Sequence, residues 1–156
     1  MDSSLDGDLS TTKGRPVAWI DSLFVDHAVF RLIWSNLAPV VPGKIYRCNH
    51  PTAPRLRRMA RRLGLRTVIN LRGKTQSGSD ALSREAAQDL GLEFHDVALE
   101  SRGAPQPDRI MRLYNLYLSM PTPAIMHCKS GADRAGLASG LMVMFAGGTS
   151  TDALRH

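Results

Sequence analysis

Cysteine is scarce in this sequence, because the 156 residues include only Cys48 and Cys128, which lie far apart in the chain. Two cysteines without paired spacing indicate neither a disulfide framework nor a cysteine-rich zinc site. A chain without disulfides suits a reducing compartment, so we predict a cytoplasmic protein.

Long uncharged apolar runs are also absent. The most apolar segment, 17–37, is interrupted by Asp21, Asp26 and Arg31, and no run reaches the ~18 uncharged residues that a membrane span requires. The N-terminus is acidic and lacks the basic start and apolar centre of a signal peptide. We therefore expect no transmembrane span and no secretion. Residues 1–15 are predicted to be a mobile tail and 16–38 a helical extension packed on the domain, with peripheral contact of this helix with a membrane or a partner as the alternative.

Aromatic residues make up only 6% of the sequence, whereas Lys and Arg outnumber Asp and Glu by 20 to 14 and give a net charge of +6. This balance favours anionic partners in general. Several arginines lie on the outer face of a helix predicted over 53–63, but no aromatic residue alternates with them to stack on bases. We therefore interpret this surface as a solvated face and do not expect nucleic acid as a partner.

Alternating apolar runs and amphipathic segments predict an α/β fold. A hairpin is expected over 40–47, with its turn at Pro42-Gly43. Downstream, strands alternate with helices, which predicts one domain over 39–156 with a mainly parallel sheet and helices on both faces. The last helix stops at His156 after less than two turns, so we expect a domain cut short at its C-terminus. The predicted strands are 67–71, 92–97 and the run ending at Cys128. The predicted helices are 53–63, 79–90 with Ser79 or Asp80 as its cap, 107–118, 136–145 and one starting at Thr149 or Ser150.

The stretch 125–136 carries the chemistry. An apolar strand ends at Cys128, five small or polar residues follow, and an apolar helix begins after Arg134. Such a loop can surround an anion with its backbone N–H groups, and the positive end of the helix points at the same place. A cysteine held there is stabilised as a thiolate nucleophile, and Arg134 can grip two oxygens of one phosphate. Gly131 allows the tight backbone turn that this loop needs.

These residues, from His127 to Gly136, resemble the Cys-x5-Arg signature of the protein tyrosine phosphatase superfamily, and most closely its atypical dual-specificity branch of small bacterial, plant and fungal enzymes. The resemblance implies a dual-specificity phosphatase fold and hydrolysis through a phosphocysteine, with no metal and no cofactor. Cys128 and Arg134 are the expected catalytic residues, and His127 is expected to orient the loop by hydrogen bonding. The phosphate-binding residues would be Lys129, Ser130, Gly131, Ala132, Asp133 and Arg134.

The general acid that protonates the leaving oxygen is left open by the sequence. Asp133 lies inside the loop, and Asp108 opens the helix that follows the loop 98–106, where dual-specificity enzymes keep their acid. We rank the two equally. Each also has a purely structural interpretation, in which Asp133 orients loop amides and Asp108 caps a helix. Asp96 and Glu100 belong to the same region but are expected to point elsewhere.

Ala135 departs from the pattern of the superfamily, which usually has Ser or Thr after the arginine to stabilise the cysteine as a leaving group. We therefore expect slow hydrolysis of the phosphoenzyme. The alternative is a weakly active phosphate-binding or redox-sensing module, in which Cys48 approaches Cys128 and traps it as a disulfide. Two further enzyme alternatives are disfavoured. The Asp-Arg-Ala-Gly ending argues against rhodanese-like sulfur transfer, and the strands that precede the loop argue against a low-molecular-weight phosphatase, whose cysteine loop follows the first strand.

The sequence limits the class of substrate but does not identify the substrate itself. The resemblance disfavours a phosphotyrosine specialist, because no recognition loop of the Lys-Asn-Arg-Tyr kind is present. Lys129 adds a cation beside the nucleophile, and Arg72, Lys74 and Arg102 are either a positive rim or ordinary surface charge. The expected partners are a phosphorylated protein or a polyphosphorylated small molecule or lipid headgroup.

Overall fold

The computed structural model describes residues 36–156. The predicted tail and nearly all of the predicted helical extension lie outside the described residues. Ala38, assigned to that extension, instead begins the first strand. Over 36–156, no helix is long and apolar enough to cross a membrane.

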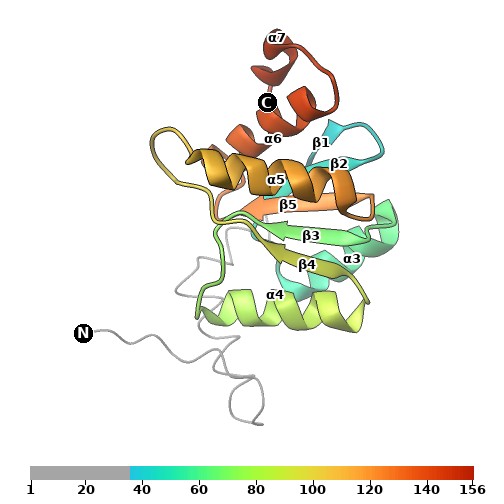
Figure 1. Ribbon diagram of the computed structural model, residues 1–156. Coiled ribbons are helices and arrows are strands. Elements are labelled where there is room, and N and C mark those ends of the chain that lie inside the picture. Colours follow the sequence, from blue (N-terminus) through green and yellow to red (C-terminus); the bar gives the residue numbers. More distant parts are fainter. Residues whose placement is uncertain (1–35) are drawn as a thin grey trace, which may run out of the picture.

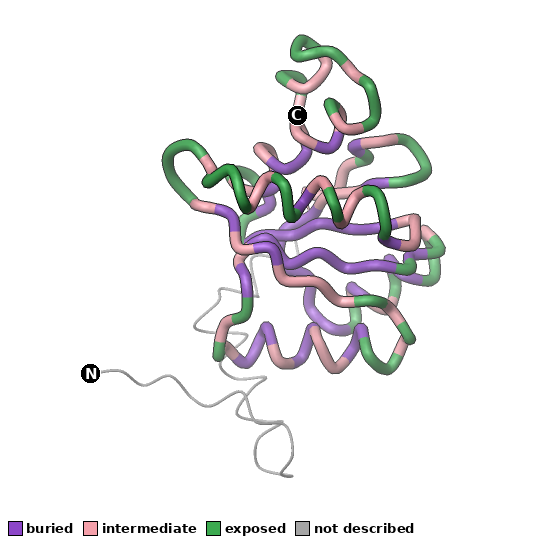
Figure 2. The backbone as a smooth tube through the Cα atoms, viewed as in Figure 1, coloured by how far each residue is buried: buried purple, intermediate pink, exposed green. Residues whose placement is uncertain are grey.

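A five-stranded sheet forms the centre of the domain (Figure 1). Its order is β1-β2-β5-β3-β4, in which β1 and β2 form the predicted antiparallel hairpin and all other neighbours run parallel. The central strand β5 is buried at every position, as expected of an apolar strand covered on both faces (Figure 2). The strands are β1 (Ala38–Val41), β2 (Ile45–Asn49), β3 (Thr67–Asn70), β4 (Glu93–Asp96) and β5 (Ala124–Cys128).

Helices cover both faces of the sheet, which confirms the predicted fold class (Figure 1). The face under α3 (Ala53–Leu63) and α4 (Gly78–Asp89) contains Cys48, Val68 and Ile125. The opposite face, under α5 (Pro107–Ser119) and α6 (Asp133–Phe145), contains Met126 and Cys128. Alternate residues of β5 therefore enter different cores. The short α7 (Ser150–Ala153) packs against α6.

Two helix starts differ from the prediction. Ser77, not Ser79 or Asp80, caps α4, and its hydroxyl accepts a hydrogen bond from the Asp80 N–H at 3.3 Å. The Asp80 carboxylate instead accepts hydrogen bonds from Arg84 and from the N–H of Thr75, which precedes the helix. α6 begins at Asp133 rather than near 136. Its first turn therefore includes Arg134.

A network centred on Arg84 joins α4 to β4. The Arg84 guanidinium donates to Asp80 at 2.8 Å and to Asp96 at 2.6 Å, and it lies 4.5 Å from the centre of the Phe94 ring. Asn70 also donates to both carboxylates, at 3.1 Å and 3.0 Å. The side chain of Asp80 is only 2% exposed, and this burial raises its pKa against the opposing effect of Arg84. Arg84 therefore compensates a charge that would otherwise be buried alone.

Replacing Arg84 with methionine is expected to lower the free energy of unfolding at pH 7 by about 2–3 kcal/mol, since Asp80 then stays buried without its cation. A carboxyl whose folded-state pKa lies above its unfolded value contributes stability at low pH and loses it as the pH rises through the folded pKa. The deficit of the variant should therefore shrink as the pH falls toward 4. Urea unfolding at several pH values measures both effects.

The matched control is Arg57→Met, which breaks the exposed Arg57–Asp89 pair at 3.1 Å. Side chains that are 34% and 57% exposed are well solvated, so this change should cost less than about 1 kcal/mol at any of these pH values. Equal losses in the two variants, or an Arg84→Met deficit that grows at low pH, would contradict the assigned role of Arg84.

Candidate active site

The loop between β5 and α6 folds back over the sulfur of Cys128, the last residue of β5. The N–H of Gly131 donates to Cys128 Sγ at 3.2 Å, and the N–H of Ala132 donates to Ser130 Oγ at 3.3 Å. The cysteine is only 2% exposed, whereas Lys129, Ser130 and Asp133 are exposed. One loop N–H therefore points at a buried sulfur, while the predicted anion cradle stays a prediction.

Gly131 determines how closely this loop approaches the sheet. Its φ is +75°, and a Cβ atom at this position would lie 2.6 Å from the backbone nitrogen of Asn49. Its carbonyl accepts a hydrogen bond from Asn36 Nδ2 at 2.6 Å, while its N–H faces the sulfur. Asn49 pairs with Cys128 in the β2–β5 register, so β2 forms the wall against which the loop turns.

His50 supports the loop, a role that sequence reasoning missed. Its backbone N–H donates to the carbonyl of Lys129 at 3.2 Å, and its Nε2 lies 3.1 Å from the carbonyl of Ser79. The available signal was its position directly after β2, because the carboxyl ends of parallel strands lie at one edge of the sheet. Asn36 offered no comparable signal, since it is distant in sequence from the loop that it contacts.

His127 lies on the α3 and α4 side of the sheet, the side opposite Cys128. It is fully buried, its ring contacts that of His50 edge to face at a centroid distance of 4.8 Å, and Phe94 lies at 6.4 Å. His127 therefore packs against the residue whose backbone holds Lys129. The predicted hydrogen-bonding role of His127 stays a prediction.

Cys48 is a poor disulfide partner for Cys128. It pairs with His127 in the β2–β5 register and packs in the core under α3, whereas Cys128 belongs to the core under α5 and α6. Side chains that point to opposite faces of a sheet cannot be bridged without backbone movement. Burial raises the pKa of the Cys48 thiol to about 12, an effect that Arg55 opposes and Cys128 reinforces. The structure thus argues against the disulfide version of the redox-sensing alternative.

The candidate acids separate into two groups. Asp96 is bound to Arg84, and Glu100 pairs with Arg109 at 3.1 Å across the loop 98–106. Asp108 and Asp133 are both exposed, in the first turns of α5 and α6. Both helices start at the edge where β5 ends, because α5 runs back from the end of β4 to the start of β5 (Figure 1). The structure thus assigns structural contacts to Asp96 and Glu100 and leaves the choice between Asp108 and Asp133 open.

Other predicted site residues lie at the same edge. Arg134 is half-buried in the first turn of α6, and Ala135 behind it is fully buried. Arg72 and Lys74 follow β3, with Arg72 half-buried and Lys74 exposed. Arg102 is exposed in the loop after β4. The positive residues proposed for the rim thus follow the carboxyl ends of neighbouring strands.

Cys128 thus ends the central parallel strand and lies under the loop that leads into α6. Residues 35–155 match the tyrosine phosphatase family, and the chain belongs to that family. A search of the curated proteins found no match.

Solved structures with the same fold include known and presumed phosphatases. The core catalytic domain of the PP-IP phosphatase SIW14 from S. cerevisiae matches with a TM-score of 0.58 and 20% identity, over 69% of this chain and 64% of that structure. This chain thus spans less than two thirds of that structure's length. A phosphatase-like protein from Neisseria meningitidis matches with a TM-score of 0.61 and 18% identity, over 77% and 84% of the two chains. PTPMT1 matches with a TM-score of 0.60 and 13% identity, over 76% and 78%.

Proposed function

We propose that Cys128 attacks the phosphorus of a phosphate monoester or phosphoanhydride while the loop 129–134 and the Arg134 guanidinium bind the other oxygens. The bond from phosphorus to the leaving oxygen breaks, and that oxygen takes a proton from Asp108 or Asp133. Water then attacks the phosphocysteine, the S–P bond breaks to restore the thiolate, and the proton of the water passes to the same carboxylate. Inorganic phosphate is released.

The observation that carries this proposal is the 3.2 Å contact from the Gly131 N–H to Cys128 Sγ. An N–H aimed at sulfur stabilises the thiolate, and in the proposed complex the other loop amides would bind the phosphate oxygens. The test is turnover of para-nitrophenyl phosphate in excess chelator. Turnover that appears only after a divalent metal is added would refute cysteine-dependent hydrolysis.

For the substrate, we propose a polyphosphorylated small molecule in preference to a phosphotyrosine protein. Lys129 is exposed beside the nucleophile, and Arg72, Lys74 and Arg102 follow the same edge of the sheet. Several cations around one phosphate site favour a substrate with more than one phosphate. The fold likeness to a PP-IP phosphatase supports the same choice. A panel of inositol pyrophosphates, phosphoinositides, phosphopeptides and nucleotides distinguishes these classes.

Ala135 is the residue that we expect to limit the second step. It is fully buried on α6, and no hydroxyl is available at this position to assist departure of the sulfur. The wild type should therefore show a burst of para-nitrophenol followed by a slower steady state. Ala135→Ser should reduce the burst and raise the steady-state rate several-fold.

Ala138→Ser is the matched control, because Ala138 is equally buried on the same helix. It adds the same hydroxyl to the core one turn further on, and the burst should be unchanged. A burst of equal size in the wild type and in Ala135→Ser would contradict the role assigned to Ala135. Absence of any turnover would instead favour the phosphate-binding module.

A further inference from the structure

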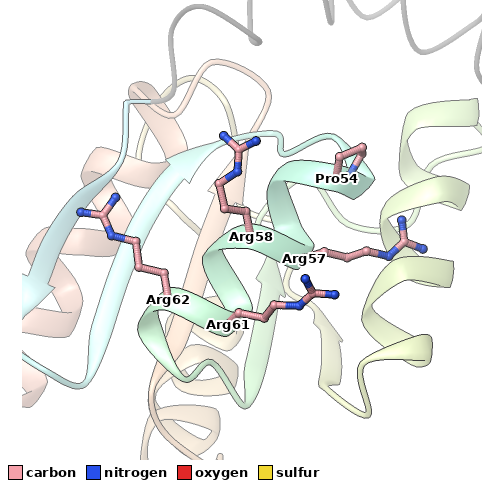
Figure 3. Close-up of a pocket in the computed structure, with 5 residues that line it drawn as sticks. All are labelled: Pro54, Arg57, Arg58, Arg61 and Arg62. Atoms are coloured by element: carbon pink, nitrogen blue, oxygen red, sulfur yellow. The ribbon is translucent and has the colours of Figure 1, made fainter.

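The outer face of α3 is a dense positive surface that the catalytic proposal does not use. We define the arginine face as Arg57, Arg58, Arg61 and Arg62, which together with Pro54 line a hollow of about 580 Å³ (Figure 3). Figure 3 shows Arg57 and Arg61 reaching toward α4, whereas Arg58 and Arg62 are directed away from it. The helix contains five arginines and no acidic residue.

Counter-charges on this surface are few. Asp89 of α4 pairs with Arg57 at 3.1 Å. Within 36–156, no carboxylate pairs with Arg58, Arg61 or Arg62. The fifth arginine, Arg55, turns inward, and its Nη1 donates to Asn49 Oδ1 at 3.3 Å. Three of the arginines that line the hollow thus have no carboxylate partner among the described residues.

This arrangement opposes helix stability. Arg57 and Arg61, like Arg58 and Arg62, are four residues apart, so like charges repel along the helix. Arg61 and Arg62 gain from the negative end of the helix in the last turn, but Arg57 and Arg58 lie too far from it. Burial lowers the pKa of Arg55, and the charge of Arg58 acts in the same direction. A bound anion would relieve this repulsion.

The chemistry of the surface limits the choice of anion. Guanidinium groups bind phosphate oxygens in pairs, so several of them suit a ligand with several phosphates. Single-stranded nucleic acid is disfavoured because α3 has no aromatic residue to stack on bases. A membrane is disfavoured because the large exposed apolar side chains of the described chain, Met111, Leu118, Met144 and Leu154, lie on or after α5, α6 and α7 instead.

We propose that the arginine face is a second anion site, which binds a compact, soluble polyphosphate separately from the Cys128 loop. The two sites are built from different parts of the fold, since α3 covers one face of the sheet and α6 the other. Binding at α3 therefore requires neither Cys128 nor Arg134, and it is independent of the proposed reaction.

Calorimetric titration with inorganic tripolyphosphate tests this inference, with Cys128→Ser as the parent protein to prevent hydrolysis. We expect two sites in the parent. Adding Arg134→Ala should remove one of them, and adding Arg58→Gln with Arg62→Gln should weaken the other by about tenfold or more. Raising the salt from about 0.1 M to 1 M should also weaken the α3 site, because the Debye length falls from about 10 Å to 3 Å.

The matched control is Arg112→Gln with Arg155→Gln, which removes the same charge from exposed positions away from α3. It should leave both sites intact. The Arg58→Gln, Arg62→Gln change in the wild type should leave para-nitrophenyl phosphate turnover within about twofold, whereas loss of turnover would place these arginines in the reaction and overturn a separate site. Thermal melts show whether each variant is folded.

Two further results would overturn the proposal. The first is a single tripolyphosphate site that Arg134→Ala abolishes. The second is that tripolyphosphate binds only at the loop, whereas a 20-nucleotide RNA or phosphatidylglycerol vesicles bind through Arg58 and Arg62. The partner of the arginine face would then be a nucleic acid or a membrane.

Discussion

Cys128→Ser is expected to lower turnover of para-nitrophenyl phosphate by on the order of 10⁴-fold or more, because a serine hydroxyl at this position has no base to activate it. The fold should persist, since serine is close in size to cysteine and the Gly131 N–H at 3.2 Å can donate to oxygen as well as to sulfur. Phosphate binding should therefore survive. Steady-state kinetics and calorimetry with inorganic phosphate measure the two effects separately.

Cys48→Ala is the internal control for this result. Cys48 is equally inaccessible, but it lies in the other core and its pKa is raised to about 12 by burial, so it stays a thiol. Its replacement should leave turnover within about twofold and cost about 1 kcal/mol of stability for the small cavity. Equal loss of activity in the two variants would mean that neither cysteine is the nucleophile.

Gly131→Ala should reduce turnover by on the order of 10²-fold, because the loop must move to admit the new methyl group. The Cβ would lie 2.6 Å from Asn49 N and 2.8 Å from the Cys48 carbonyl carbon, and both are backbone atoms of β2. Displacing the loop separates the Gly131 N–H from the sulfur. We also expect a loss of about 2 kcal/mol or more in the free energy of unfolding.

Gly43→Ala is the control that introduces the backbone strain of a positive φ without a steric contact of the new Cβ atom. Gly43 has nearly the same φ, +72°, in the β1–β2 turn, but nothing lies within 4 Å of a Cβ there. This variant should lose about 1–2 kcal/mol of stability for the left-handed conformation and keep full activity. If Gly131→Ala and Gly43→Ala had the same kinetics, close packing of the loop on β2 would not matter for catalysis.

Much of the fold followed from local patterns. The helix over 53–63 was predicted with its actual bounds because Pro54 and Gly64 mark its two ends. The starts of α4 and α6 were misplaced by a few residues. Asp80 has the chemistry of a cap, but its carboxylate accepts hydrogen bonds from Arg84 and Asn70, and Ser77 caps the helix.

By itself, the sequence determined the α/β order, the position of the Cys128–Arg134 loop after the last strand and the departure at Ala135, because these depend on spacing along the chain. The tertiary structure alone decided that β2 lies beside β5, so that Asn49 and His50 support the loop and Cys48 faces away from Cys128. It also brought Asn36 to the carbonyl of Gly131. Neighbours across a sheet come from chain segments far apart, and their contacts depend on strand order and register, which local propensity does not encode.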